Sequence, residues 1–155
     1  MSFQISALPH EPFAPLFGLD DAQLSARGAR RYIADRRPGF PCRVSLTDAA
    51  PGERIFLVPF THHDADSPYR ASGPIFIRED ARQASLGVNE VPELLRLRLL
   101  SVRAYDANAL MVDADVVDGR ELESVIERLF SDPQVTYLHV HFARPGCFAC
   151  RIDRA

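Results

Sequence analysis

The chain has 155 residues, of which 46% are hydrophobic and 25% charged, as in an ordinary soluble globular protein. Its net charge of −3 argues against a nucleic-acid partner, and it has no apolar run of the roughly 20 residues that a membrane span needs. The start of the chain lacks the basic and apolar regions of a signal peptide, so we expect a cytoplasmic protein with a single domain over residues 1–155.

The first half of the chain predicts short strands and one capped helix. Asp20 and Gln23 are spaced as in a capping box, which predicts a helix start. Pro59 has no amide donor, so the strand that ends with it should lie at an edge or a bulge. We expect residues 61–74 to form a loop. The predicted strands cover residues 3–8, 30–35, 54–60 and 75–78.

The second half has clearer periodicity. Pro92 suits the first turn of a short helix that runs to about residue 98. Residues 99–105 and 110–117 alternate between apolar and polar, as half-buried strands do. In the second of these strands, the expected buried face is Leu110, Val112, Ala114 and Val116.

A helix and two strands complete the prediction. Asp118 and Glu121 predict a second capping box, and the helix after it should end before Asp132-Pro133. Its apolar side is Leu122, Val125, Ile126, Leu129 and Phe130. Strands follow at residues 135–142 and up to about Asp153. This order predicts an α+β fold, with a mostly antiparallel mixed sheet and two or three helices.

The sharpest chemical pattern is HVHFARPGCFAC at residues 139–150. His139 and His141 share one face of a strand, because residues i and i+2 point the same way. Matching the apolar residues of the two strands predicts that Cys147 lies opposite His141 and that Cys150 is buried. The pattern also suits a metal site through His139, His141 and Cys147, but Cys-x-x-Cys chelates a metal only where the backbone turns.

The earlier hairpin extends the same polar face if both hairpins belong to one sheet. Apolar matching of its strands places Arg103 opposite Asp113 and Ser101 opposite Asp115. With Tyr105, this face then holds imidazoles, a thiol, carboxylates and a guanidinium, which together could bind a ligand. Solvated cross-strand pairs would give the same pattern.

Two other stretches carry reactive residue types. Cys42 has Arg43 beside it, which favours a thiolate, but free cysteine is more often buried and structural. His62, His63, Asp64 and Asp66 have no ordered metal-ligand spacing, so a polar loop is the favoured interpretation. In the same loop, Arg70 is the preferred contact for an anion.

Five blocks of the sequence resemble a known family. They are RRYIADRRPGFPCRVSL, SPYRASGPIFIRE, LLSVRAYDA, MVDADVVDG and HVHFARPGCFA. The chain resembles, over nearly its whole length, an uncharacterised bacterial family described only as a domain of unknown function. The resemblance implies no activity, cofactor or catalytic residue.

Three functions remain open. The first, which we favour, is a small-molecule-binding protein or enzyme. In it His139, His141 and Cys147 would be catalytic, and the ligand would be bound by Arg70, Arg103, Tyr105, Asp113 and Asp115. The second is a metal-binding protein through His139, His141 and Cys147. The third is a non-catalytic interaction module. The sequence does not identify a cofactor, a reaction or an oligomeric state.

Overall fold

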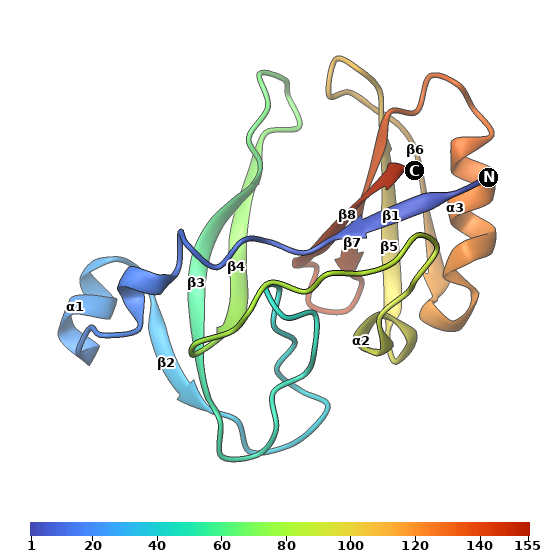
Figure 1. The fold of residues 1–155 in the computed structure, drawn as a ribbon. Coiled ribbons are helices and arrows are strands. Elements are labelled where there is room, and N and C mark those ends of the chain that lie inside the picture. The colour runs from blue at the N-terminus through green and yellow to red at the C-terminus, as the bar shows by residue number, and fades with distance from the viewer. The chain divides into compact units, whose positions relative to one another are not determined.

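A computed structural model describes all residues from Met1 to Ala155 (Figure 1). The chain has three α-helices and eight strands, and the strands form two antiparallel sheets. This arrangement confirms the α+β class. In chain order the elements are β1 Phe3–Ser6, 3₁₀ helix η1 Ala14–Leu16, α1 Asp21–Ala26, β2 Arg30–Ile33, β3 Arg54–His63, β4 Ala71–Arg78, α2 Glu93–Arg96, β5 Leu99–Tyr105, β6 Met111–Asp118, 3₁₀ helix η2 Gly119–Glu121, α3 Leu122–Phe130, β7 Tyr137–Phe142 and β8 Phe148–Arg154.

The chain divides into two compact units. Unit 1 comprises Met1–Ser6, Thr61–Gly73 and Ser85–Ala155, and unit 2 comprises Ala7–Phe60 and Pro74–Ala84. The single domain over residues 1–155 stays a prediction. No helix has both the length and the apolar composition to cross a membrane.

Unit 1 contains a five-stranded sheet with the order β1-β8-β7-β5-β6. One face of this sheet carries an apolar layer, and α3 lies along the sheet (Figure 1). The predicted apolar side of α3 is confirmed, because all five of its residues are buried. The layer on the sheet includes Ile5, Leu100, Val102, Ala104, Leu138, Val140, Phe142, Cys150 and Ile152, whose pairing places them on one face.

The start of α3 differs from the prediction. The Asp118 carboxylate accepts a hydrogen bond from the backbone N–H of Arg120, so it caps η2 rather than forming a capping box with Glu121. The residue after Asp118 is glycine because its backbone packs closely against α2. A Cβ atom at this position would lie 1.7 Å from the carbonyl oxygen of Leu95. The predicted capping box of α1 is confirmed, with both hydrogen bonds between Asp20 and Gln23 present.

The predicted buried face of β6 is wrong. Val117, and not Ala114 as apolar matching predicts, pairs with Leu100, and Val112 and Val116 are exposed. A bulge beside Tyr105 shifts the register at the other end of this pair. An edge strand has a neighbour on one side only, so alternation in its sequence does not by itself identify the buried face.

Unit 2 includes β2 and most of β3 and β4, which form a sheet of order β2-β3-β4. Pairing of β2 with β3 ends at Leu57, so Pro59 lies beyond the paired segment and its missing donor costs nothing on that side. Strand β3 continues past Pro59 to His63, so the expected end of this strand at residue 60 is wrong.

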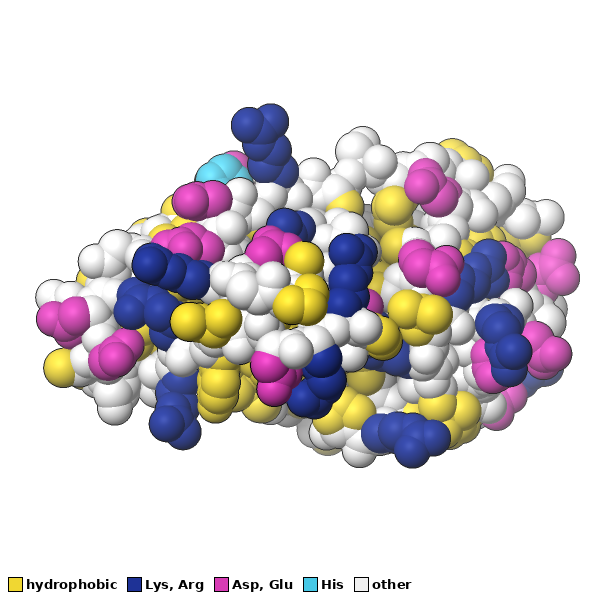
Figure 2. Space-filling model, turned by 90° about the horizontal axis from the view of Figure 1, so that it is seen from below, with side chains coloured by type: hydrophobic (Ala, Val, Ile, Leu, Met, Phe, Trp, Pro, Cys, Tyr) yellow, Lys and Arg dark blue, Asp and Glu magenta, His cyan; other side chains and the backbone are white.

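Basic and acidic side chains are mixed on the surface, and many of them form ion pairs. Examples are Arg120 with Asp118, and Arg96 with Glu123. Figure 2 shows basic and acidic side chains interspersed on the face that it displays. Exposed pairs such as Arg120 with Asp118 contribute little to stability.

Candidate functional site

The candidate site lies in unit 1, on the face of the five-stranded sheet opposite the apolar layer. Strands β5, β7 and β8 place three rows of side chains on this face. The rows are Ser101, His141 and Phe148, then Arg103, His139 and Arg151, then Tyr105, Tyr137 and Asp153. We call these nine residues the histidine face.

Two more imidazoles pack on the histidine face from the end of β3, also in unit 1. The His62 ring stacks on Phe148, with 5.5 Å between centroids and 11° between planes, and lies 5.0 Å from His141. The His63 ring lies 5.0 Å from His139 and 4.3 Å from Tyr105. Four histidines therefore meet among aromatic rings.

His63 is fixed through both ring nitrogens. Its Nδ1 lies 2.8 Å from the carbonyl oxygen of Tyr69, which can only accept, so Nδ1 carries the hydrogen. In the neutral ring, Nε2 is then an acceptor, and the Tyr137 hydroxyl donates to it at 2.6 Å. The carbonyl thus selects the tautomer, and a phenol, an imidazole and a carbonyl form a hydrogen-bonded chain.

His139 is the central residue of the middle row. It is 3% exposed, and its Nδ1 is buried without a hydrogen-bond partner. The pKa of His139 is lowered to about 3, mainly by burial and also by the nearby His63, His141, His62 and Arg151. The ring is therefore neutral at physiological pH, with one nitrogen that donates and one that accepts.

The tyrosines of the third row are buried phenols beside guanidinium groups. Burial raises the pKa of Tyr105, and Arg103 opposes this by charge and by a hydrogen bond. Burial also raises the pKa of Tyr137, whereas Arg151, 4.1 Å above its ring, opposes the rise. Both phenols keep their protons at neutral pH and can donate hydrogen bonds.

The structure brings together four of the predicted site residues: Arg103, Tyr105, His139 and His141. The predicted register of the last hairpin is wrong, because Phe148, not Cys147, pairs with His141. A bulge beside His141 causes the change, and matching of apolar residues cannot detect a bulge. Cys147 instead lies before β8 and is partly exposed, whereas Cys150 is buried as predicted.

Asp113 and Asp115 do not lie on the histidine face. They pair with Ala104 and Val102, and not with Arg103 and Ser101 as predicted. Both carboxylates bind Arg128 of α3, at 3.2 and 2.7 Å. The predicted polar face therefore loses both carboxylates to a salt bridge on the opposite side of the sheet.

The expected loop over residues 61–74 is much shorter, because β3 ends at His63 and β4 begins at Ala71. His62 and His63 are therefore strand residues and not part of a polar loop, which corrects the prediction. Arg70 is exposed in the remaining loop and forms an ion pair with Asp64. Its contact with an anion stays a prediction.

Sequence reasoning missed several members of the cluster, which include His62, His63, Tyr137, Phe148 and Arg151. Tyr137 could have been predicted from the sequence, because it is two residues before His139 and so lies on the same face of the strand. His63 required knowledge of tertiary structure, since 74 residues separate it from its partner Tyr137.

His63 and His141 each hydrogen-bond to a backbone carbonyl group of the protein. His141 Nδ1 lies 3.0 Å from the carbonyl oxygen of Gly146, and so carries a hydrogen. No group of three or more His, Cys, Asp or Glu side chains is placed to hold a metal ion. The displacement of Cys147 from His141 removes the geometric basis for the predicted set of His139, His141 and Cys147.

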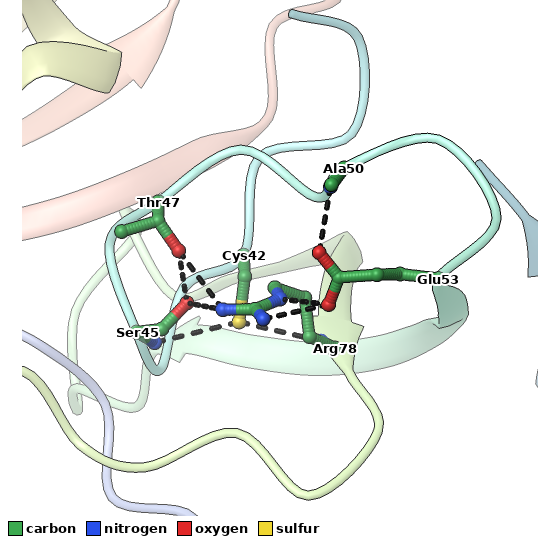
Figure 3. A network of polar contacts seen from close by, with 6 residues as sticks. All are labelled: Cys42, Ser45, Thr47, Ala50, Glu53 and Arg78. Carbon is green, nitrogen blue, oxygen red and sulfur yellow. Dashed lines mark hydrogen bonds and ion pairs between the residues drawn. The ribbon is translucent and has the colours of Figure 1, made fainter. Parts of the chain in front are cut away.

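Cys42 belongs to a separate polar network in unit 2 (Figure 3). Its sulfur is fully buried and accepts hydrogen bonds from the backbone N–H groups of Ser45 and Arg78, at 3.4 and 3.3 Å. The Arg78 guanidinium binds the Glu53 carboxylate at 2.9 and 2.6 Å (Figure 3). This geometry supports a structural Cys42 that joins its loop to β4.

Unit 2 also has a concavity of about 400 Å³. Its lining includes His10, Phe17, Asp80, Arg82 and Gln83. Charges of both signs line it, so it does not select one ligand chemistry.

The three thiols should differ in reactivity. Cys147 is partly exposed, whereas Cys42 and Cys150 are at most 1% exposed. We expect native protein treated with iodoacetamide at neutral pH to be alkylated at Cys147 at least tenfold faster than at the other two, as read by peptide mass spectrometry. Equal rates at Cys147 and Cys150 would contradict the buried position of Cys150, and unfolding in urea should make all three rates similar.

The fold and site define an α+β protein with a buried cluster of histidines and tyrosines on one face of an antiparallel sheet. The chain belongs to the family described as "Protein of unknown function (DUF1203)", whose model matches residues 39–154. No curated protein and no solved structure shows significant similarity to it. The matched range contains all the residues of the histidine face, together with His62 and His63.

Proposed function

We propose that this protein binds a small organic anion on the histidine face. The observation that carries the proposal is His139 Nδ1, a buried polar atom without a hydrogen-bond partner between two arginine positions. A buried polar group without a partner costs about 1–3 kcal/mol. A ligand that supplies the missing hydrogen bond would recover this free energy.

In this site, the arginines would neutralise the charge of the ligand, and His139 would supply the hydrogen bond. The low pKa of His139 keeps its ring neutral, so it would recognise the ligand by hydrogen bonding alone. Arg103 and Arg151, directly opposite His139 on the neighbouring strands, would compensate the negative charge. Arg151 already binds Asp153, so Arg103 is the principal candidate for the anion contact.

The burial of the imidazoles argues against a non-catalytic interaction surface. His139 and His141 are 3% and 1% exposed, whereas a surface that docks a partner presents its side chains to solvent.

We also propose a cytoplasmic location, which the three free cysteines support.

The anion proposal predicts an effect of Arg103. Sodium acetate and orthophosphate, titrated into ¹⁵N-labelled protein at constant ionic strength, should shift the side-chain resonances of His139. Arg103→Gln should weaken binding of the responding anion at least tenfold, because it removes the charge opposite His139. Arg27→Gln, at an exposed arginine of unit 2, is the matched control and should leave the affinity unchanged. If neither anion shifts His139, or if both variants bind equally, the proposal is wrong.

A further inference from the structure

The hydrogen-bonded chain from Tyr137 through His63 to the Tyr69 carbonyl contains no residue of the predicted catalytic set. We propose that Tyr137 and His63 form a proton-relay pair, in which Tyr137 exchanges a proton with a small anionic ligand that carries a hydroxyl or carbonyl group. This inference rests on the proposed ligand site. It assigns Tyr137 as the group that touches the ligand and His63 as the group that acts through Tyr137.

The geometry supplies a donor, an acceptor and an orienting group in one line. The Tyr137 hydroxyl is 2.6 Å from His63 Nε2, and His63 Nδ1 is 2.8 Å from the Tyr69 carbonyl oxygen. A nucleophile or acid next to a base that is oriented by a third group is the arrangement used in acid–base and acyl-transfer sites. The imidazolium formed when Nε2 takes a proton keeps its Nδ1–H bond to the carbonyl, which disperses the new charge.

The proton transfer balances within the described residues and the ligand. A ligand hydroxyl gives its proton to Tyr137 Oη while the original Oη proton moves to His63 Nε2. The phenol ends neutral, the imidazole becomes an imidazolium, and the ligand oxygen becomes an alkoxide. In the reverse direction, Tyr137 donates to a ligand oxygen and recovers its proton from His63.

The surroundings of Tyr137 suit both directions. Burial keeps its phenol protonated at rest, so the proton to be moved is in place. The Arg151 guanidinium, 4.1 Å from the ring centroid, stabilises negative charge that develops on the phenol oxygen. Tyr137 and His139 are two residues apart on β7 and lie on the same face of the sheet. A ligand bound to His139 Nδ1 would therefore lie beside the row that contains the Tyr137 phenol.

The relay can be tested without knowing the ligand. N-acetylimidazole transfers an acetyl group to a phenol oxygen that loses its proton: the O–C bond forms, the N–C bond breaks and imidazole leaves with the proton. We expect acetylation of Tyr137 to be faster than that of Tyr69 at pH 7.5, although Tyr69 is 39% exposed and Tyr137 only 8%. Site-resolved rates are read by peptide mass spectrometry.

The decisive variant is His63→Gln. Glutamine retains a hydrogen-bonding group but is not a base at this pH, so the Tyr137 rate should fall at least tenfold. His10→Gln, the same substitution in unit 2, should change neither rate. Absence of acetylation at Tyr137, or an unchanged rate in His63→Gln, overturns the relay.

A second measurement covers the case in which His63→Gln does not fold. In Tyr137→Phe, the ¹⁵N resonance of His63 Nε2 should lose the shift caused by its hydrogen bond, while Nδ1 stays protonated. An unchanged Nε2 resonance overturns the relay. Acetate and orthophosphate, added separately to the wild type, distinguish the two proposals. If either anion slows acetylation of Tyr137, the anion site is supported, whereas fast, His63-dependent acetylation that both anions leave unchanged supports the relay and overturns the anion site.

Discussion

Lowering the pH from 7 to 5 is expected to destabilise the folded protein by about 2 kcal/mol through His139 alone. The pKa of His139 is about 3 in the folded state, against an ordinary value of 6.5. Between these two values the unfolded chain binds a proton that the folded chain does not, so stability falls as the pH falls. Each unit of pKa difference is worth about 1.4 kcal/mol, so the full loss, which is reached only below pH 3, approaches about 5 kcal/mol.

Urea unfolding at pH 7, 6 and 5 measures this dependence. His139→Phe should flatten the curve over this range, because phenylalanine takes up no proton and suits the aromatic surroundings. His10→Phe, at a more exposed histidine, should retain the wild-type slope. Parallel curves for His139→Phe and wild type would show that His139 titrates normally. The carboxylates with lowered pKa, such as Glu53 and Glu123, lose their contributions at lower pH and affect both proteins equally.

Replacing Leu122 by alanine is expected to lower the free energy of unfolding by about 2–5 kcal/mol. Leu122 is the first residue of α3 and is fully buried. Truncation removes buried apolar area and leaves a cavity, because the sheet beneath the helix can close it only in part.

Leu97→Ala is the matched control. Leu97 is 53% exposed, so the same truncation leaves no cavity and should cost less than about 0.5 kcal/mol. Chemical denaturation at pH 7 compares the two variants. Equal costs for the two truncations would show that the face of α3 that bears Leu122 is not buried against the sheet.

The sequence by itself determined the elements whose side chains have one consistent environment. The apolar side of α3 repeats at helical spacing and is buried as predicted, because a single sheet face covers it. The alternation of β5 and β7 likewise identified the buried Leu100, Val102 and Val140, since both are interior strands of the sheet. The same alternation correctly placed His139 and His141 on one face.

Only the tertiary structure decided what that face contains. A bulge beside His141 replaced Cys147 by Phe148, and the register of the edge strand β6 moved Asp113 and Asp115 to the opposite side. One inserted residue moves every residue beyond it to the other face of the sheet, and matching of apolar residues cannot predict such an insertion. His63 reached Tyr137 across 74 residues of sequence, a distance over which local patterns carry no information about contact. The imidazoles were therefore predictable as a pair on one strand, whereas the hydrogen-bonded chain around them depended on packing between segments remote in the sequence.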